Sequence, residues 1–519
     1  MNGAHALLAT LRSNNITTCF ANPGTSEMHF VAGLDEVNEI RGVLCLFEGV
    51  ATGAADGYAR VTGRAASTLL HLGPGLTNGW ANLHNARRAR VPLINIVGDH
   101  ATYHSPLDAP LQSDISSIAG ALEGWQRRTL HPNDVVKDVT DAVSAAYGPP
   151  GLISTLILPA NVSWGTVTEP PNHWPVATIR APDAPEDNAI DLALDRLRTT
   201  RSAIFLGGPA LRRAPLSLAQ RIAEATGVRV IMETFPAIVD RGQGTFHPER
   251  MNYLSEFAIA QMHDLETLVL IGANQPVGFF AYPDVASHLV PQSCVTVPVA
   301  PPGTDVLMAL HALADGLSAN ATTRSEHHPL PDPGVGALNS SVLAAVIGSS
   351  ITEGLIVADE SNTAGMHLYG ATRGAPPHEW MTLTGGAIGF GLPVAVGAAV
   401  GSGRRVLALQ ADGSMLYTPQ ALWTMAREGL DVTVVGLSNR SYAILNLERQ
   451  RVGIVGEGAT SQRLLEIDDP TLDLCALASA QGVPSVRVHT GEELSVALRR
   501  SFATPGPMFI EAVLPKGFS

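Results

Sequence analysis

The chain alternates short apolar runs with longer amphipathic stretches from one end to the other. Apolar runs of this kind are typical of strands buried on both faces, which occur in parallel sheets covered by crossover helices. The predicted strands lie at residues 42–47, 66–72, 92–99, 152–159, 202–208, 229–234, 266–273, 354–361, 404–412, 431–439 and 506–515. The alternation therefore predicts an α/β fold of doubly wound parallel sheets.

Two polar, proline-rich stretches interrupt this alternation, at residues 168–188 and 318–336. Proline lacks a backbone N–H and fixes φ, so such stretches form neither helices nor central strands. A chain of 519 residues is also too long for one hydrophobic core. We therefore expect three α/β domains, at residues 1–167, 189–317 and 337–519.

The composition of the chain limits the kinds of molecule that it can bind and the compartment in which it is expected. The formal net charge of −14 disfavours binding to nucleic acid or to an anionic membrane surface. The four cysteines are far apart and form no CxxC pair, as in proteins of a reducing compartment. Residues 1–15 have the pattern of an amphipathic helix rather than a signal peptide, and no apolar run reaches membrane-spanning length. We expect a cytoplasmic protein with a small-molecule ligand.

The first candidate site lies in the last third of the chain. Predicted strands at residues 406–410 and 433–437 flank a helix. Thr418 is the expected N-cap of this helix, Pro419 its first residue and Gly429 its terminator. A right-handed crossover brings the carboxyl ends of both strands to one edge of the sheet, where α/β proteins bind ligands.

Polar side chains follow both of these strands. Asp412 and Asn439 offer a carboxylate and an amide oxygen, and the backbone carbonyl of Ser441 is the candidate third ligand. Mg²⁺ prefers oxygen ligands in near-octahedral geometry and shares its coordination with phosphates. Gly413 lets the backbone approach a phosphate, and Ser414 adds a hydroxyl and an N–H. The pattern predicts a site for Mg²⁺ and a diphosphate.

This segment resembles a known motif. An Asp-Gly-Ser followed after about two dozen residues by Asn is the thiamine-diphosphate (ThDP) motif of the superfamily that includes acetolactate synthase, benzoylformate decarboxylase and pyruvate oxidase. The match departs at Ala411, where glycine is usual, and at Ser438, which replaces the first residue of the common Asn-Asn pair. Neither change removes a metal ligand. The resemblance implies that ThDP and Mg²⁺ are the cofactors.

Glu48 is the second candidate. It follows an apolar strand and opens a helix of small residues that runs to Ala59, so it could simply complement the helix dipole. Its setting also resembles the glutamate segment of the same superfamily, matched here through residues 56–60. That resemblance implies that Glu48 bonds N1′ of the aminopyrimidine and favours its imino tautomer, whose N4′ removes the thiazolium C2 proton.

The resemblance also implies an assembly, because the first domain of one subunit of such enzymes meets the last domain of another. A homodimer at minimum, and a homotetramer as the common form, is therefore expected. Further segments resemble parts of the same superfamily, at residues 21–27, 70–78, 359–363 and 384–393. By this resemblance the other cofactor-binding residues are Asn22, Pro23, Gly24, Asn362, Thr363, Gly386, Ile388 and Tyr442. The Gly386 carbonyl would accept from the 4′-amino group, and Ile388 would bend ThDP into a V shape.

Fewer residues indicate the substrate. Ser26 and His71 match positions that meet the substrate carboxylate and the intermediate in benzoylformate decarboxylase, although His71 could also be a structural histidine at a strand end. The second active-site histidine of that enzyme has no counterpart in the middle domain. Residues 278–282 carry aromatic side chains there, which line an apolar pocket or belong to the core. Roles in the site and on the surface both stay open for His100, His104 and Glu448.

The resemblance implies an enzyme that decarboxylates 2-oxo acids, ligates their acyl group to a second carbonyl compound, or both, through a C2 carbanion and an enamine. The chain is similar to acetolactate synthase large-subunit homologues over nearly its whole length. An acetolactate synthase acting on pyruvate is therefore one alternative, although that enzyme's loop after the third strand and its Gln-Trp pair are missing. A non-catalytic ThDP-binding homologue or regulatory partner is the alternative of another class. FAD is not expected, because the middle domain lacks a convincing flavin or dinucleotide loop.

Overall fold

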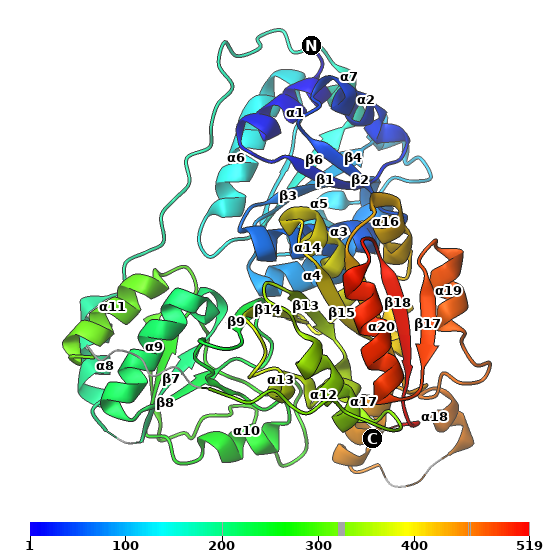
Figure 1. Ribbon diagram of the computed structural model, residues 1–519. Coiled ribbons are helices and arrows are strands. Elements are labelled where there is room, and N and C mark those ends of the chain that lie inside the picture. Colours follow the sequence, from blue (N-terminus) through cyan, green and yellow to red (C-terminus); the bar gives the residue numbers. More distant parts are fainter. Residues whose placement is uncertain (200, 320–326, 455, 457, 518–519) are drawn as a thin grey trace.

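The computed structural model describes residues 1–199, 201–319, 327–454, 456 and 458–517. They form three α/β regions, each built around its own mainly parallel sheet (Figure 1). The predicted fold class is therefore confirmed. Within these described ranges, no helix has both the length and the apolar character needed to cross a lipid bilayer.

The N-terminal region has a six-stranded parallel sheet in the order β2-β1-β3-β4-β6-β5. Helices α1, α2 and α6 share a core on one face, and α3, α4 and α5 cover the other. The strands are β1 Thr18–Asn22, β2 Arg41–Leu44, β3 Ala66–Leu70, β4 Leu93–Asp99, β5 Trp125–Arg128 and β6 Ile153–Pro159. The helices are α1 Gly3–Ser13, η1 Thr25–Glu27, α2 Met28–Glu36, α3 Glu48–Thr62, α4 Leu72–Ala89, η2 Ser105–Leu107, α5 Ile115–Gly120, η3 Pro132–Asp134, α6 Val135–Tyr147 and α7 Ala160–Trp164.

The middle region has a five-stranded parallel sheet in the order β10-β8-β7-β11-β12. Its strands are β7 Ser202–Leu206, β8 Arg229–Met232, β10 Glu249–Arg250, β11 Thr267–Ile271 and β12 Val295–Ala300. Its helices are α8 Asp187–Arg196, η4 Gly208–Leu211, α9 Arg213–Thr226, α10 Ser255–Met262 and α11 Val306–Gly316.

The C-terminal region has a seven-stranded sheet in the order β17-β18-β16-β15-β13-β14-β9. Its own strands are β13 Ile356–Glu360, β14 His378–Thr382, β15 Val406–Ala411, β16 Val432–Ser438, β17 Ser485–Val488 and β18 Met508–Val513. Its helices are α12 Ser340–Ser350, η5 Asn362–Gly365, α13 Leu368–Ala371, α14 Gly391–Ser402, α15 Asp412–Met415, α16 Gln420–Glu428, α17 Ala443–Arg451, α18 Ala459–Arg463, α19 Leu474–Ala480 and α20 Gly491–Ala503.

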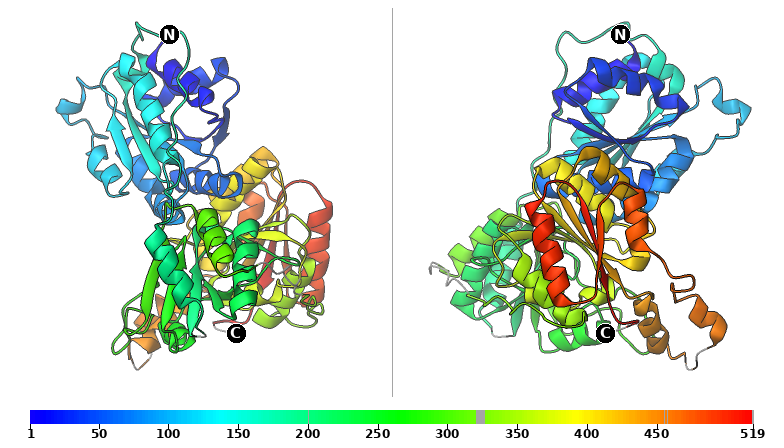
Figure 2. Two further views of the ribbon diagram at one scale, coloured as in Figure 1. Left: turned by 90° about the vertical axis from the view of Figure 1, so that its left-hand side faces the viewer. Right: turned by 45° about the vertical axis from the view of Figure 1, so that its right-hand side comes forward.

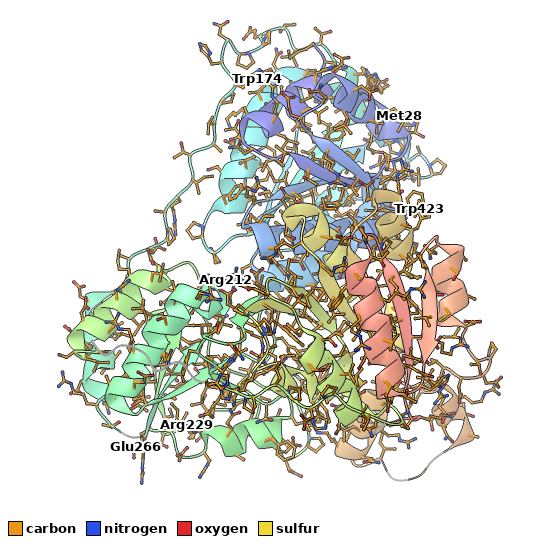
Figure 3. All side chains as sticks on the ribbon, in the orientation of Figure 1. Met28, Trp174, Arg212, Arg229, Glu266 and Trp423 are labelled. Carbon is orange, nitrogen blue, oxygen red and sulfur yellow. The ribbon has the colours of Figure 1, made fainter. Side chains whose placement is uncertain are left out.

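Strand β9, Val239–Arg241, departs from the predicted organisation. It lies within the segment predicted as the middle domain, yet it pairs antiparallel with β14 and forms the edge of the C-terminal sheet. Arg241 is buried there, with its guanidinium carbon 3.2 Å from the ring centroid of Tyr369. Arg212 of the middle region, labelled in Figure 3, pairs with Glu379 at the same edge. These contacts join two regions that the sequence pattern separates.

The first predicted linker has no helix or strand from residue 168 to residue 186, apart from an isolated bridge at Asp183. It runs along the outside of the molecule between the N-terminal and middle regions (Figures 1 and 2). The second predicted linker falls partly on residues 320–326, which lie outside the described residues. Its remaining residues, 318–319 and 327–336, contain no helix or strand.

Helices α3 and α14 make the most extensive contact between the N-terminal and C-terminal regions. A methyl group added at Gly57 would lie 2.1 Å from the backbone oxygen of Val394, and one added at Gly397 would lie 1.7 Å from that of Ala54. Both distances are far below van der Waals contact, so these glycines are required for the two backbones to touch. The helix that Glu48 opens is therefore fixed against the C-terminal region.

Candidate active site

Strands β15 and β16 end at the same edge of the C-terminal sheet. They are adjacent and parallel, with Ala411 opposite Leu437. Asp412 begins α15 directly after β15, and its carboxylate accepts from the backbone N–H of Arg440, just after β16, at 2.6 Å. The structure thus brings together the two loops that carry the predicted metal ligands.

The predicted helix cap was wrong: α16 begins at Gln420 after Pro419, and the hydroxyl of Thr418 donates instead to the Gly389 carbonyl at 3.0 Å.

Asp412, Asn439 and Ser441 are all buried at this edge. The amide oxygen of Asn439 accepts from the Ser441 N–H at 3.1 Å, which fixes the turn of the loop. Burial raises the pKa of Asp412 to about 6, against the lowering effect of its N–H donors. Among the residues that the structure describes, no group of three or more His, Cys, Asp or Glu side chains could hold a metal. A set of one carboxylate, one amide and one carbonyl suits Mg²⁺, which takes its remaining ligands from phosphates.

The predicted diphosphate residues surround this loop. A methyl group at Gly413 would lie 2.5 Å from the Tyr442 ring, so Tyr442 packs directly on the glycine turn. Ser414 donates its hydroxyl to the Ala411 carbonyl at 3.1 Å. Asn362 follows β13, the neighbour of β15, and has a left-handed φ of 50°. Asn362 is exposed and Thr363 half-buried, both at the same sheet edge.

Glu360 was not assigned a role from the sequence, although it lies within the resembling segment at residues 359–363. Its buried carboxylate accepts from the N–H groups of Gly389 and Gly391 at 2.7 and 2.6 Å, and from Gln410 at 2.9 Å. Gln410 also donates to Ser414 at 2.7 Å. Burial raises the pKa of Glu360, and these donors lower it. Glu360 therefore connects the loop before α14 to the strand that leads into the metal site.

The loop before α14 carries Gly386 and Ile388. Helix α4 donates to its carbonyls on both sides: Asn85 bonds Ala387 at 2.8 Å, and Asn82 bonds Gly389 at 3.1 Å. The Gly386 carbonyl receives no hydrogen bond from any described residue, and its φ is 75°. Ile388 is half-buried and packs against the core around α3 and α14. The arrangement leaves the Gly386 oxygen available to an external donor.

Glu48 is the first residue of α3 and is buried. One carboxylate oxygen accepts from the Asn78 amide at 3.1 Å. The ion pairs formed by the described residues do not include Glu48, and none of their hydrogen bonds joins it to the loops of Asp412 and Asn439. A buried carboxylate held by one amide and no cation is suited to bond a proton-bearing nitrogen of a ligand.

His71, the N-cap of α4, is paired with a carboxylate that sequence reasoning missed. Its Nδ1 lies 2.8 Å from Glu27, which is 3% exposed and also accepts from the Gly24 N–H at 2.7 Å. Burial raises the pKa of Glu27, while the charge of His71 lowers it. When Glu27 is ionised, Nδ1 of His71 is the donor of this pair, and no hydrogen bond of the described residues engages Nε2. Half-buried Ser26 lies in the same turn.

The loop of Gly24 stands close to this histidine. A methyl group at Gly24 would lie 2.3 Å from Nδ1 of His71, so any larger residue at this position would collide with the histidine ring. Asn22 ends β1 opposite Leu70 of β3, one residue before His71, and Pro23 is half-buried between Asn22 and Gly24. The predicted residues of the N-terminal region therefore converge on one sheet edge.

We expect Glu27→Gln to lower kcat by at least about 10-fold, because glutamine keeps the acceptor oxygen but removes the negative charge that lies 2.8 Å from Nδ1 of His71 during proton transfer. Glutamine keeps an oxygen for the Gly24 N–H, so ThDP affinity should stay unchanged. The measurement is the pH profile of kcat beside ThDP titration. Glu36→Gln is the matched control, since Glu36 pairs with His5 at 2.6 Å on the surface of the same region. An unchanged pH profile and kcat in Glu27→Gln would contradict a positioning role.

His100, His104 and Glu448, whose roles the sequence leaves open, lie in two other places. His100 and His104 follow β4, with ring centroids 5.2 Å apart. Glu448 lies on α17 and accepts from the Tyr282 hydroxyl at 2.6 Å, while Arg451 pairs with it at 3.1 Å. Glu448 is therefore engaged with the middle region.

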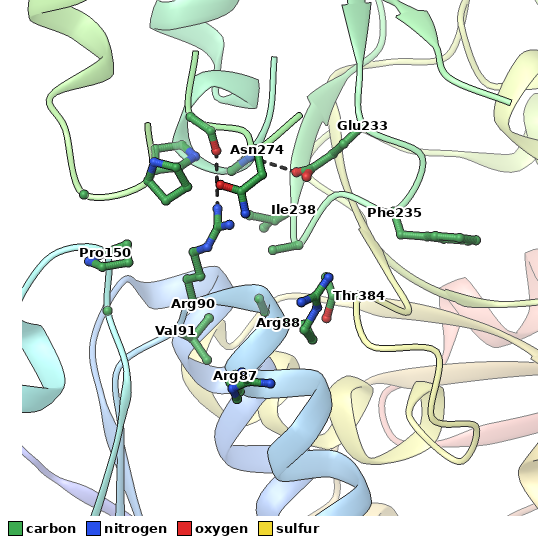
Figure 4. Close-up of a pocket in the computed structure, with 18 of the residues that line it drawn as sticks. Arg87, Arg88, Arg90, Val91, Pro150, Glu233, Phe235, Ile238, Asn274 and Thr384 are labelled. Atoms are coloured by element: carbon green, nitrogen blue, oxygen red, sulfur yellow. Dashed lines mark hydrogen bonds between the residues drawn. The ribbon is translucent and has the colours of Figure 1, made fainter. Parts of the chain in front are cut away.

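A cavity of about 880 Å³ lies where the three regions meet (Figure 4). Three arginines from the end of α4 approach it from one side, and Glu233 and Asn274 of the middle region from the other; the arginines are Arg87, Arg88 and Arg90. Glu233 accepts from the Gly208 N–H at 2.8 Å. Burial raises the pKa of Glu233 to about 7, against the lowering effect of that N–H and of Arg90.

Glu233→Gln should stabilise the protein at high pH. A folded pKa of about 7 against the ordinary 4.5 means that stability is full when the group is protonated and is lost as the pH rises through 7. Glutamine keeps the acceptor for Gly208 and carries no charge. We expect the Tm to rise by about 2 °C or more at pH 8 and less at pH 5, with exposed Glu266→Gln as control. An equal gain at both pH values would contradict the raised pKa.

Comparisons with known proteins agree with this geometry. Residues 1–119 match the model of the N-terminal TPP binding domain of thiamine pyrophosphate enzymes, and residues 362–512 match that of the C-terminal TPP binding domain. A Mycobacterium tuberculosis protein with the provisional name acetolactate synthase large subunit IlvX is 50% identical over 518 residues, 99% of each chain. Benzoylformate decarboxylase of Pseudomonas aeruginosa is 28% identical over 524 residues, 96% of each chain.

Solved structures share the fold. The ThDP-dependent 4-hydroxybenzoylformate decarboxylase of Rhodococcus jostii RHA1 superposes with a TM-score of 0.83 at 22% identity, covering 100% of both chains. Benzoylformate decarboxylase from Polynucleobacter necessarius gives the same TM-score, identity and coverage. Because two TPP-binding models and a full-length relative at 50% identity match this sequence, the chain belongs to the thiamine pyrophosphate (thiamine diphosphate) enzyme family.

Proposed function

We propose that the protein is a ThDP- and Mg²⁺-dependent enzyme that breaks or forms the carbon–carbon bond next to the carbonyl of a 2-oxo acid. The observation that carries this proposal is the joining of the Asp412 and Asn439 loops at one sheet edge. That edge is linked through Glu360 to the loop whose Gly386 carbonyl is free. The names of the relatives, acetolactate synthase and benzoylformate decarboxylase, support 2-oxo acids as the substrate class.

Each end of the cofactor has its own residues in this proposal. Asp412, Asn439 and Ser441 hold Mg²⁺. The diphosphate is contacted by Asn362, Thr363, Gly413, Ser414 and Tyr442. The pyrimidine and thiazolium are held by Gly386, Ile388, Asn22, Pro23 and Gly24. When bound, ThDP supplies a carbon nucleophile that adds to the substrate carbonyl.

The chain's own groups supply orientation and proton transfer. Glu48 holds a proton at N1′ of the pyrimidine, and the Gly386 oxygen orients the 4′-amino group. Ser26 and Nε2 of His71 bind the substrate carboxylate, and His71, supported by Glu27, moves a proton at the reacting carbon.

We place Glu48 of one subunit against the C-terminal region of its partner, which requires a homodimer and is compatible with a homotetramer. The lack of any hydrogen bond from Glu48 to the metal loops among the described residues of one chain supports this. We also propose domain borders at residues 1–167, 189–317 and 337–519, with β9 crossing to the third sheet, and a cytoplasmic location. FAD is not part of the proposal, because the Gly208 N–H that would meet a phosphate is engaged by Glu233.

Two alternatives are weighed against this function. The name of the relative at 50% identity favours an acetolactate synthase, which would convert pyruvate alone into a branched 2-hydroxy-3-oxo acid. A non-catalytic ThDP-binding homologue or regulatory partner would need neither the buried carboxylate of Glu48 nor the His71–Glu27 pair. The retention of both favours an enzyme.

The test is titration of the apo-protein with ThDP in the presence and absence of Mg²⁺, followed by CO₂ release from a panel of 2-oxo acids. We expect Mg²⁺-dependent binding and CO₂ release, with the aldehyde or hydroxyketone product identified by mass spectrometry. Acetolactate from pyruvate alone would select the synthase. Tight ThDP binding without CO₂ release from any acid would favour the non-catalytic homologue, and no ThDP binding would overturn the proposal.

A further inference from the structure

Four aromatic side chains of the middle region form one connected cluster, here called the aromatic wall: Phe235, Tyr253, Phe279 and Phe280. Phe279 lies at its centre, with ring centroids 5.8 Å from Phe235, 5.6 Å from Tyr253 and 5.0 Å from Phe280. Phe235 and Tyr253 also contact each other at 5.9 Å. The Phe279–Tyr253 pair is tilted and the other three pairs are edge-to-face, the arrangement that aromatic rings favour over face-to-face stacking.

The aromatic wall stands against the loop that carries Gly386. A methyl group added at Gly386 would lie 2.6 Å from Cζ of Phe279, so the tip of this ring touches the glycine backbone. Phe235, Tyr253 and Phe279 also line the cavity at the junction of the three regions, together with Thr384 of the same loop. The aromatic wall therefore borders both the candidate cofactor site and an open space.

Large apolar side chains on the aromatic wall are left uncovered in the described chain. Phe279 is 43% exposed and Phe280 is 54% exposed, whereas Phe390 and Phe509 of the adjoining C-terminal region are fully buried. Exposed apolar area beside a binding site marks a place where a ligand removes that area from water. The group that covers the aromatic wall is thus expected to be apolar.

Two arginines that lie against aromatic rings of this part of the middle region are engaged by other protein groups. Arg451 stacks on Tyr282, 3.7 Å from its ring centroid, and pairs with both Glu448 and Glu256. Arg250, whose guanidinium lies 5.9 Å from the Phe235 ring, donates to the Thr234 carbonyl. Both cations are therefore engaged by protein groups, and the three arginines of the cavity described above come from the end of α4, on its other side.

We propose that the aromatic wall is the acyl pocket, with Phe279 as the residue that selects 2-oxo acids carrying a bulky apolar, branched or aromatic side chain over pyruvate. This inference rests on the proposed function, because it places the substrate's side chain beyond the carbonyl that meets the cofactor near Gly386. The methyl group of pyruvate is too small to cover the wall.

The test compares kcat/KM of the holoenzyme for benzoylformate and pyruvate. We expect the wild type to prefer benzoylformate, and Phe279→Ala to lower that preference over pyruvate by about 10-fold or more. Phe257→Ala is the matched control, since Phe257 is 60% exposed on α10 of the same region and does not belong to the aromatic wall. An unchanged preference in Phe279→Ala would overturn the assignment.

A binding measurement separates this inference from the proposed function. Calorimetry of the holoenzyme with the unreactive 2-hydroxy acids mandelate and lactate should show tighter mandelate binding, weakened by Phe279→Ala with ThDP affinity unchanged. CO₂ release from pyruvate in preference to benzoylformate would overturn the acyl pocket and leave the proposed function standing. CO₂ release from no acid would overturn the proposed function, and the mandelate result would then decide the pocket alone.

Discussion

Glu48→Gln is expected to lower turnover of the 2-oxo acid substrate by about 100- to 10,000-fold, the usual worth of a positioned acid or base. Glutamine has the same size and keeps an oxygen for the Asn78 amide, so α3 should stay in place. It cannot hold a proton at N1′ of the pyrimidine as a carboxylate does. ThDP affinity should change by only a few fold, because the diphosphate and metal carry most of the binding.

Two measurements check this expectation: CO₂ release under saturating ThDP, and exchange of the C2 proton of bound ThDP with solvent followed by NMR. Both should fall together in Glu48→Gln. Glu353→Gln is the control, since Glu353 is exposed and far from α3 in sequence. Full turnover in Glu48→Gln would assign the carboxylate to the helix dipole alone.

The second large effect is expected at Asp412. Asp412→Asn removes the one carboxylate of the proposed metal set, and we expect Mg²⁺-supported ThDP affinity to fall by about 100-fold or more, since a divalent ion loses its charged ligand. The same loss should follow in the wild type when Mg²⁺ is removed with EDTA. Turnover at saturating ThDP and Mg²⁺ should recover in part, because Asn439 and Ser441 remain.

Calorimetric titration with ThDP at several Mg²⁺ concentrations measures this directly. Asp332→Asn serves as the control, because Asp332 is exposed and lies before the C-terminal region. Circular dichroism of the apo forms should be the same for all three proteins. Mg²⁺-dependent binding of wild-type strength in Asp412→Asn would mean that the metal is held elsewhere.

Much of the fold could be predicted from the sequence, because parallel strands buried on both faces are continuous apolar runs. The strands at Val406–Ala411 and Val432–Ser438 show this, and their polar ends follow from chain direction alone. Strand β9 could not be predicted in the same way. Its three residues include Asp240 and Arg241, and Arg241 is buried only because Tyr369 and Trp380 of the C-terminal region surround it.

The candidate site likewise contains some residues that the sequence predicts and others that it does not. Glu48 and Asp412 each directly follow a predicted strand, so the neighbouring sequence is enough to predict where they lie. Glu27 and Glu360 act through partners far away in the chain, His71 and Gln410, and no local pattern reports such contacts. The contact of Phe279 with Gly386 joins different regions across about a hundred residues of sequence and depends on their docking.

The contact between α3 and α14 limits how this chain can be recombined with its relatives. Gly57 and Gly397 leave no space for a Cβ, and each faces the backbone of the other helix rather than a side chain that can rotate away. In a chimera that takes α3 from one parent and α14 from another, the two helices will pack together only if both parents have glycine at these two positions. In engineering by segment exchange, α3 and α14 must therefore be taken from the same parent, although more than three hundred residues separate them in the chain.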